Sequence, residues 1–381
     1  MYVPAFPGLA PADLVRPGAH RAARFPFNAP RQLRFYRARN AIYHLFRALP
    51  SKHRRLRVIA PDYYSGNEVL AMSSAGAAIH YARVNRDMRL DPAEVERLCE
   101  LHDPDVLFVI HYLGWPQPIG ELAKICRRRG IALVEDCALS LLSDADGRPL
   151  GSFGDYAIFC LYKTVPVPNG ALLVANGPDL EALHSLTLRP AGSFSVFGRL
   201  AELLTVRLHS RADWPGGVLH DAKRRAGRIL SALGIRRTPV GDIGFDLADV
   251  DLAMSRVSNR LVDAFDFTAI RQRRVDNFRQ LDALIDGHAT RAHRELADGL
   301  CPLSFPILVV DKHAAARALR RRGVEAIEMW NDDGGAGYFG MSEDVRFLRR
   351  HVLELPVHQD LTARHIAHTA REVAALGLRM T

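Results

Sequence analysis

Residues 131–171 read IALVEDCALSLLSDADGRPLGSFGDYAIFCLYKTVPVPNGA, and this stretch decides the fold class. IALVE and YAIFCLY are short apolar runs, typical of strands that are buried on both faces of a parallel sheet. Asp136 comes just past the first run, and Lys163 stands where the second run stops. Open α/β sheets bind ligands beyond the carboxyl ends of their strands. Because burying either charge alone is costly, we expect both side chains to face a bound group.

Helix-like and strand-like segments alternate on both sides of this stretch. The segment 91–102 starts with Asp91 as a helix N-cap and Pro92 at the first helical position, and 121–130 ends in basic residues and Gly130. Helices are predicted at 38–49, 67–76, 91–102 and 121–130, and strands at 56–61, 78–84, 105–114, 131–135, 156–162 and 171–175. This alternation predicts an α/β protein whose largely parallel sheet is covered by helices on both faces.

A second, smaller α/β unit is predicted toward the C-terminus. The periodicity over 250–285 reads as one continuous helix that bridges two domains. It is followed by a strand at 303–310, a helix at 312–323, a strand at 324–330 and a last helix from Leu361. We therefore expect a large domain over 1–245, with an irregular N-terminal arm at 1–35, and a small domain over 246–381.

Composition excludes several classes of protein. The 381 residues are 48% hydrophobic and 24% charged, as in ordinary soluble proteins. Five cysteines without a Cys-x-x-Cys spacing indicate neither a disulfide framework nor a zinc site, so a reducing cytoplasm is the simplest compartment. The N-terminus is interrupted by prolines, and no apolar run approaches membrane-spanning length. No metal site is predicted.

The net charge of +9 is concentrated in one region. Residues 181–240 hold ten Lys and Arg against four acids, most of them in a basic helical segment at 194–237. No aromatic platform or docking motif accompanies this charge, so nucleic acid is not the expected partner. A solvated helical face is the simpler interpretation, and an anionic substrate, a carrier or a membrane surface are the alternatives.

The Lys163–Asp136 pair suggests pyridoxal phosphate. A lysine at a strand end can form a Schiff base with this cofactor, and a facing carboxylate can keep the pyridine nitrogen protonated. A helix N-terminus around Arg39 and Asn40 could bind the phosphate, and Tyr63 or Tyr64 could lie against the ring. Each requirement is met beyond a predicted strand or at a helix start.

With these residues in place, the chain resembles the DegT/StrS family of sugar aminotransferases, within fold type I of the pyridoxal-phosphate enzymes. The resemblance is carried by ordered segments from RARNAIYHLFRAL through VIAPDYYSGNEVL, VLFVIHYLGWPQPIGELAKICRRRGIALVEDCA and GRPLGSFGDYAIFCLYKTVPVPNGALLV to LELPVHQDL. It implies a seven-stranded, mostly parallel large-domain sheet and a homodimer with active sites at the subunit interface. It also implies transfer of an amino group from glutamate or glutamine to a keto group, which is carried by a nucleotide-linked sugar or by a cyclitol.

Carried over residue by residue, the family pattern makes Lys163 the cofactor lysine and Asp136 the partner of the ring nitrogen. It puts Arg39, Asn40 and Cys160 near the phosphate, where the family usually has Gly-Thr or Gly-Ser and a serine. Leu139 replaces the usual Gln or His, and Asp251 begins DLAM in place of Asn-x-Arg-Met. These departures leave open a non-catalytic paralogue that binds or assembles within the same kind of pathway.

Other candidates have structural alternatives. His111 could contact substrate, and Trp115 and Trp330 could shape the substrate pocket, although packing explains each as well. His365 and His368 are expected at the surface of the last helix, and Asp144-Ala-Asp146-Gly147 is expected to form a hairpin turn and not a calcium loop.

Overall fold

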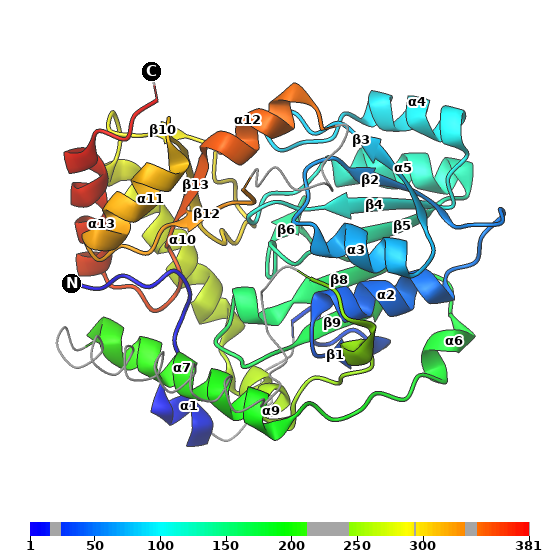
Figure 1. Ribbon diagram of the computed structural model, residues 1–381, viewed down its shortest axis with the longest axis horizontal. Coiled ribbons are helices and arrows are strands. Elements are labelled where there is room, and N and C mark those ends of the chain that lie inside the picture. Colours follow the sequence, from blue (N-terminus) through cyan, green and yellow to red (C-terminus); the bar gives the residue numbers. More distant parts are fainter. Residues whose placement is uncertain (16–23, 212–243, 293–294, 332–340, 381) are drawn as a thin grey trace.

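The computed structural model describes residues 1–15, 24–211, 244–292, 295–331 and 341–380. Two sheets organise these residues, a large one and a small one, with the small-domain elements on the left of Figure 1 and the large sheet on the right. The fold predicted from the sequence is confirmed. The division into domains near residue 245 stays a prediction.

The large sheet has seven strands in the order β1-β9-β8-β5-β4-β2-β3. Strands β3, β2, β4, β5 and β8 run parallel, and β9 lies antiparallel to both β8 and β1. The bounds are β1 (Gln32–Phe35), β2 (Arg57–Pro61), β3 (Ala78–Ala82), β4 (Val106–Ile110), β5 (Ala132–Asp136), β8 (Tyr156–Cys160) and β9 (Ala171–Ala175).

The central strands are buried along their whole length, as their unbroken apolar runs predict. Every residue of β4 and β8 is buried. Full burial of each large aliphatic or aromatic side chain is worth roughly 1.5–3 kcal/mol relative to exposure. The sheet core is therefore a rigid base for the loops that follow its carboxyl ends.

Helices cover both faces of this sheet (Figure 1). Helices α2 and α3 pack against each other, as do α4 and α5, and the two pairs lie on opposite faces of the sheet. Asp91 caps α4 by accepting a hydrogen bond from the backbone N–H of Ala93, and Gly130 ends α5 in the left-handed conformation at φ 63°. The bounds are α2 (Ala38–Ala48), α3 (Asn67–Ser74), α4 (Pro92–His102), α5 (Ile119–Arg129), α6 (Glu181–His184) and α7 (Ser193–Arg211).

The small sheet has four antiparallel strands in the order β10-β11-β13-β12. Its strands are β10 (Thr290–Arg291), β11 (Phe305–Leu308), β12 (Ile327–Glu328) and β13 (Val352–Leu355). Its helices are α10 (Phe267–Leu284), α11 (Lys312–Arg321), α12 (Glu343–His351) and α13 (Ala363–Leu376). Helix α13 packs against α10 and α11.

The expected continuous helix over 250–285 is wrong. The chain forms a short 3-10 turn η2 (Leu247–Asp249), an extended stretch, then α9 (Arg256–Ala264) and α10. Ser255 and Asp266 each accept a hydrogen bond from a backbone N–H of the helix that follows, so each starts a new helix. Ala253 bridges to Phe35 of β1, which keeps the preceding residues extended.

Three further expectations need correction. The arm at 1–35 is not wholly irregular, because it contains α1 (Pro11–Val15) and the sheet-edge strand β1. The strand expected at 324–330 is reduced to the two residues of β12. His365 and His368 are buried and do not lie at the surface. The Nε2 atom of His365 lies within hydrogen-bond distance of the Ser210 carbonyl, and that of His368 lies within hydrogen-bond distance of the Arg322 carbonyl.

The Asp144–Gly147 segment forms the predicted hairpin. Strands β6 (Asp144–Ala145) and β7 (Arg148–Pro149) pair antiparallel, with Asp146 and Gly147 both at positive φ in the turn. The Asp144 carboxylate pairs with Arg24 and Arg271.

In the part of the chain described, no helix combines the length and the apolarity needed to cross a bilayer.

Candidate active site

A cavity of about 190 Å³ lies beyond the carboxyl ends of the parallel strands. Its wall comes from α2, from the start of α3, from the ends of β5 and β8, and from the residues that follow β12. The lining residues are Ala38, Arg39, Ile42, Ser65, Asn67, Glu68, Asp136, Ala138, Cys160, Tyr162, Lys163, Trp330 and Asn331. Asp136, Lys163, Arg39 and Cys160 are therefore brought together as the sequence predicts.

Asp136 is the last residue of β5 and is 2% exposed. Its Oδ1 accepts a hydrogen bond of 2.8 Å from the backbone N–H of Ala138. Burial and the negative charge of Glu68 raise the pKa of the Asp136 carboxyl to about 7, while the Ala138 hydrogen bond and Lys163 act in the opposite direction. A buried carboxylate held at such a pKa binds a cationic hydrogen-bond donor more readily than a neutral one.

Lys163 ends the 3-10 turn η1 (Leu161–Lys163), directly after β8. Within the part of the chain that the structure describes, its amine makes no hydrogen bond or ion pair. The next residue is firmly held, because the carbonyl of Thr164 accepts hydrogen bonds from Arg274 at 2.9 Å and from Gln359 at 3.0 Å. The backbone is thus fixed while the amine faces the cavity.

Arg274 is the long-range anchor of this turn. It lies in α10, is 1% exposed and also donates to the carbonyls of Pro302 and Leu303. Burial lowers the pKa of its guanidinium, and the nearby Cys301 and Asp360 side chains act in the opposite direction. Arg274, together with Gln359, therefore ties the Lys163 turn to residues that lie more than 100 positions later in the chain.

Arg39 and Asn40 are adjacent in α2 but have different surroundings. Arg39 lines the cavity and donates a hydrogen bond to the carbonyl of Gly244. Asn40 points elsewhere: it is fully buried, and its Nδ2 donates to the carbonyl of Asp249 at 2.7 Å. Of these two neighbours, only Arg39 places a charged donor in the cavity wall.

The predicted ring-facing tyrosines do not line the cavity. Tyr63 is fully buried, with its ring edge-on to Trp330 at 4.7 Å, and Tyr64 stacks on Tyr81 at 5.5 Å. Instead, both rings lie beside the Arg349 guanidinium, and each also packs against another aromatic side chain. The aromatic residues in the cavity wall are Tyr162 and Trp330, the latter at φ 38°.

Glu68 is a cavity residue that the sequence did not single out. Glu68 is 7% exposed, and its carboxylate accepts hydrogen bonds from the hydroxyl and the backbone N–H of Ser65. The sequence signal that could have indicated Glu68 was its position three residues after Ser65, at the start of a helix that follows a strand. Trp330, which the sequence offers as a residue that could shape the substrate pocket, lines the cavity from the segment that follows β12.

His111 and Trp115 do not reach this cavity. His111 is fully buried, with Nε2 3.0 Å from Glu135 Oε2, and its Nδ1 accepts a hydrogen bond from the backbone N–H of Gln117. The assignment of Nδ1 as acceptor leaves Nε2 as the donor to Glu135. Trp115 donates from its indole N–H to the carbonyl of Glu295 and packs against Phe278.

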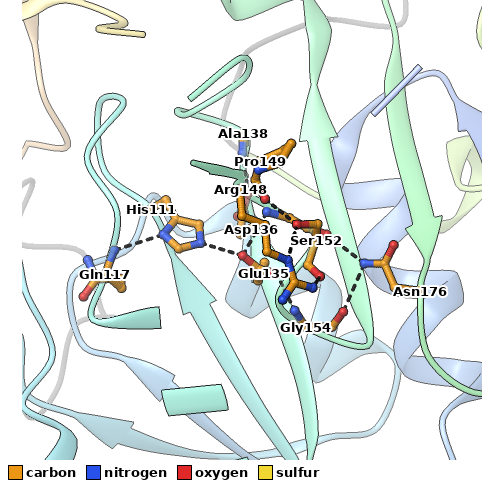
Figure 2. Close-up of polar contacts among 11 residues, drawn as sticks. His111, Gln117, Glu135, Asp136, Ala138, Arg148, Pro149, Ser152, Gly154 and Asn176 are labelled. Atoms are coloured by element: carbon orange, nitrogen blue, oxygen red, sulfur yellow. Dashed lines mark hydrogen bonds and ion pairs between the residues drawn. The ribbon is translucent and has the colours of Figure 1, made fainter. Parts of the chain in front are cut away.

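Glu135 is the centre of the network in Figure 2. Its carboxylate accepts hydrogen bonds from the backbone N–H groups of Gly151 at 2.9 Å and Gly154 at 2.5 Å, in addition to His111. Asn176 continues the network by donating to the carbonyls of Gly151 and Gly154. This network fixes the strand residue directly before Asp136 and the loop that leads into β8.

The departures from the family pattern are placed as follows. Cys160 is 1% exposed, and burial raises the pKa of its thiol. Leu139 is buried and lines a neighbouring cavity. Asp251 has a 42% exposed side chain and lies 3.1 Å from His44 Nε2. Whether any of the three touches a cofactor stays a prediction.

Comparison with known proteins supports the resemblance seen in the sequence. Residues 41–197 match the model of the DegT/DnrJ/EryC1/StrS aminotransferase family. GDP-perosamine synthase of Vibrio cholerae is 26% identical over 138 residues, which are 35% of this chain and 37% of that protein. The dTDP-4-dehydro-2,3,6-trideoxy-D-glucose 4-aminotransferase of Saccharopolyspora spinosa is 33% identical over 76 residues, 19% of this chain and 20% of that protein. The matched region thus spans well under half of these relatives.

The fold agrees over the whole chain. PseC of Helicobacter pylori, an aminotransferase involved in the biosynthesis of pseudaminic acid, superposes with a TM-score of 0.69 at 15% identity, covering 99% of both chains. The similarity at this level of identity shows a shared fold.

Proposed function

We propose that this chain, whose residues 41–197 match the DegT/DnrJ/EryC1/StrS aminotransferases, is a pyridoxal-phosphate-dependent aminotransferase. The observation that carries the proposal is the cavity that Asp136, Lys163 and Arg39 line together. Each of these charges comes from a different element of the large domain, and each sits in or beside a buried wall. With Glu68, the cavity wall holds two cations and two carboxylates, which can bind a ligand that carries charges of both signs.

The donor set fits the three polar parts of pyridoxal phosphate. Lys163 provides the amine for the aldehyde, Asp136 the carboxylate for the ring nitrogen and Arg39 a cation for the phosphate. When bound, the cofactor supplies an electron sink for breaking bonds at the amine-bearing carbon.

The residues of this chain perform the remaining work. Asp136 holds a proton between its carboxylate and the ring nitrogen, and the Ala138 N–H orients that carboxylate. Lys163, when its amine is free, accepts and returns a proton from a turn that Arg274 keeps in place. Trp330 and Tyr162 close the apolar side of the cavity against water.

The half-reaction with 2-oxoglutarate tests this proposal. Protein loaded with pyridoxamine phosphate is mixed with 2-oxoglutarate, and glutamate formation is followed together with the visible absorbance of the cofactor. We expect glutamate from the wild type and none from Lys163→Ala. A wild type that stays colourless with pyridoxal phosphate would contradict the proposal.

A non-catalytic paralogue is the second candidate, favoured by Leu139 and Cys160, which offer no strong hydrogen bond beside the cavity. This candidate predicts that the cofactor binds but that no amino group moves from any donor. Glutamate formation in the half-reaction decides against it.

The acceptor, the assembly and the location belong to the same proposal. We expect glutamate or glutamine as donor, and a keto group on a nucleotide-linked sugar or a cyclitol as acceptor, because the named relatives act on nucleotide sugars. A panel of keto-sugar nucleotides assayed with glutamate tests this. We also expect a cytoplasmic homodimer with active sites at its interface, which cell fractionation and sedimentation velocity test.

The basic segment at 194–237 remains a hypothesis about the acceptor. Helix α7 covers its first part, and residues 212–237 lie outside the described residues. If the segment contacts an anionic substrate group, charge reversal at Lys223, Arg224 and Arg225 raises the KM for the acceptor. An unchanged KM would refute that contact.

A further inference from the structure

Lys163 lies between two cavities. Beside the cofactor cavity there is a second one of about 140 Å³, and the side chains of Lys163 and Trp330 line both. Asp136 and Arg39 line only the first cavity. Leu139, Arg274, Ser304 and Glu354 line only the second.

Glu354 is the unexplained charge of the second cavity. It lies in β13, is 7% exposed and receives a hydrogen bond of 2.7 Å from the Ser304 hydroxyl at Oε2. Within the described residues, Oε1 has no hydrogen bond. Burial raises the pKa of the Glu354 carboxyl, and the positive charges of Lys163 and Lys312 oppose that rise.

The cations near Glu354 are not equivalent to Lys163. Lys312 donates to the carbonyls of Met329 and Arg349, and Arg274 to those of Thr164, Pro302 and Leu303. Both are therefore committed to the backbone. The Lys163 amine is the cavity-lining cation without such bonds in the described chain.

The other titratable side chains around Lys163 either line the first cavity or are paired with other residues. Asp136, Glu68 and Arg39 line the cofactor cavity, as do the Cys160 thiol and the Tyr162 phenol. Glu328 of β12 lines the second cavity, but its carboxylate contacts His313 and Asn331. Glu354 is thus the carboxylate that faces Lys163 from the small domain.

We propose that Glu354 is a positioning residue for Lys163 and stabilises the positive charge on the lysine nitrogen from the second cavity, whereas Asp136 lines the first. This inference rests on the proposed function, because it requires Lys163 to be the residue that bonds the cofactor. The carboxylate stabilises the protonated nitrogen by its charge, and Ser304 orients the carboxylate. Strand β13 would then take part in setting the pH range in which the site works.

A spectroscopic pH titration tests this without any acceptor substrate. The visible absorbance of full-length protein loaded with pyridoxal phosphate reports protonation of the nitrogen that joins Lys163 to the cofactor. We expect Glu354→Gln to lower the pH midpoint of this change by on the order of one unit, because a nearby negative charge is lost. We expect Ser304→Ala to lower it less, since the carboxylate remains but is less well held in its ionised form.

Glu328→Gln is the matched control, because it removes the same charge from the same cavity wall. Its midpoint should equal that of the wild type, and a shift as large as that of Glu354→Gln would overturn the inference. An unshifted midpoint in Glu354→Gln would do the same, and if that variant does not load cofactor, an unshifted Ser304→Ala decides. A wild type without a visible band overturns the proposed function itself.

Discussion

Asp136 and Lys163 line the same cavity from the ends of two hydrogen-bonded parallel strands, β5 and β8. Asp136 pairs in register with Ile158, two residues before β8 gives way to the turn that carries Lys163. The strand pairing therefore sets where the two segments leave the sheet. The hydrogen bonds from Arg274 and Gln359 to the Thr164 carbonyl then hold the turn that carries Lys163.

The pH dependence of stability should contain a contribution from Asp136. Its pKa is raised from 3.8 to about 7 in the folded protein, so the folded state keeps a proton that the unfolded state has lost. We expect the free energy of unfolding of cofactor-free protein to fall as the pH rises from about 4 to about 7, by up to a few kcal/mol. Urea denaturation across this range measures it.

The variant Asp136→Asn should lack this contribution, whereas Asp87→Asn, at an exposed position, should retain it. Equal pH profiles for the wild type and Asp136→Asn would show that the carboxyl is not protonated in this range.

Arg39→Ala should weaken binding of pyridoxal phosphate about 10- to 100-fold, because a charge-assisted hydrogen bond is worth about 1.5–3 kcal/mol. Affinity for pyridoxal, which lacks the phosphate, should change little. Fluorescence titration with both ligands makes the comparison. The control Arg47→Ala removes an exposed cation from the last turn of the same helix. Equal losses for both ligands would place Arg39 away from the phosphate.

Glu135→Ala should lower the free energy of unfolding by about 3–5 kcal/mol, because it leaves His111 and two buried backbone N–H groups without their acceptor. Glu100→Ala, which removes an exposed partner of Arg129, should cost less than about 1 kcal/mol. Chemical denaturation of both variants measures the difference. Similar small losses would mean that Glu135 is dispensable for the loop before β8.

Gly114→Ala should destabilise the protein much more than Gly76→Ala. Both glycines have positive φ, 111° and 95°, so both substitutions strain the backbone. Only at Gly114 would the new Cβ come within 2.5 Å of a backbone atom, the carbonyl oxygen of Cys301. We expect an additional loss of about 1–3 kcal/mol at Gly114. Thermal unfolding of the two variants tests it, and equal losses would contradict the close approach.

The sequence was sufficient where local pattern and strand ends decide the structure. The runs that became β4 and β8 are apolar throughout, and β5 is apolar before Glu135, so their burial in a parallel sheet followed from composition and alternation. Asp136 and Lys163 were predictable because strand ends converge at one edge.

It was insufficient where contacts distant along the chain decide. Helical periodicity continued through Asp266, although a cap there starts α10 afresh, and nothing local orients Tyr63 away from the cavity. Glu354 shares a cavity with Lys163 from β13 of the small sheet, so it could not be assigned to the site before the two sheets were placed together.

The central claim is that Lys163 is the residue that bonds the cofactor. The purified protein is incubated with pyridoxal phosphate, reduced with borohydride and digested, and the modified peptides are identified by mass spectrometry. We predict that the reduced adduct is on Lys163 and is absent from Lys163→Ala, while the exposed Lys52 and Lys124 stay unmodified at equimolar cofactor. Adducts on those exposed lysines with none on Lys163 would contradict the account.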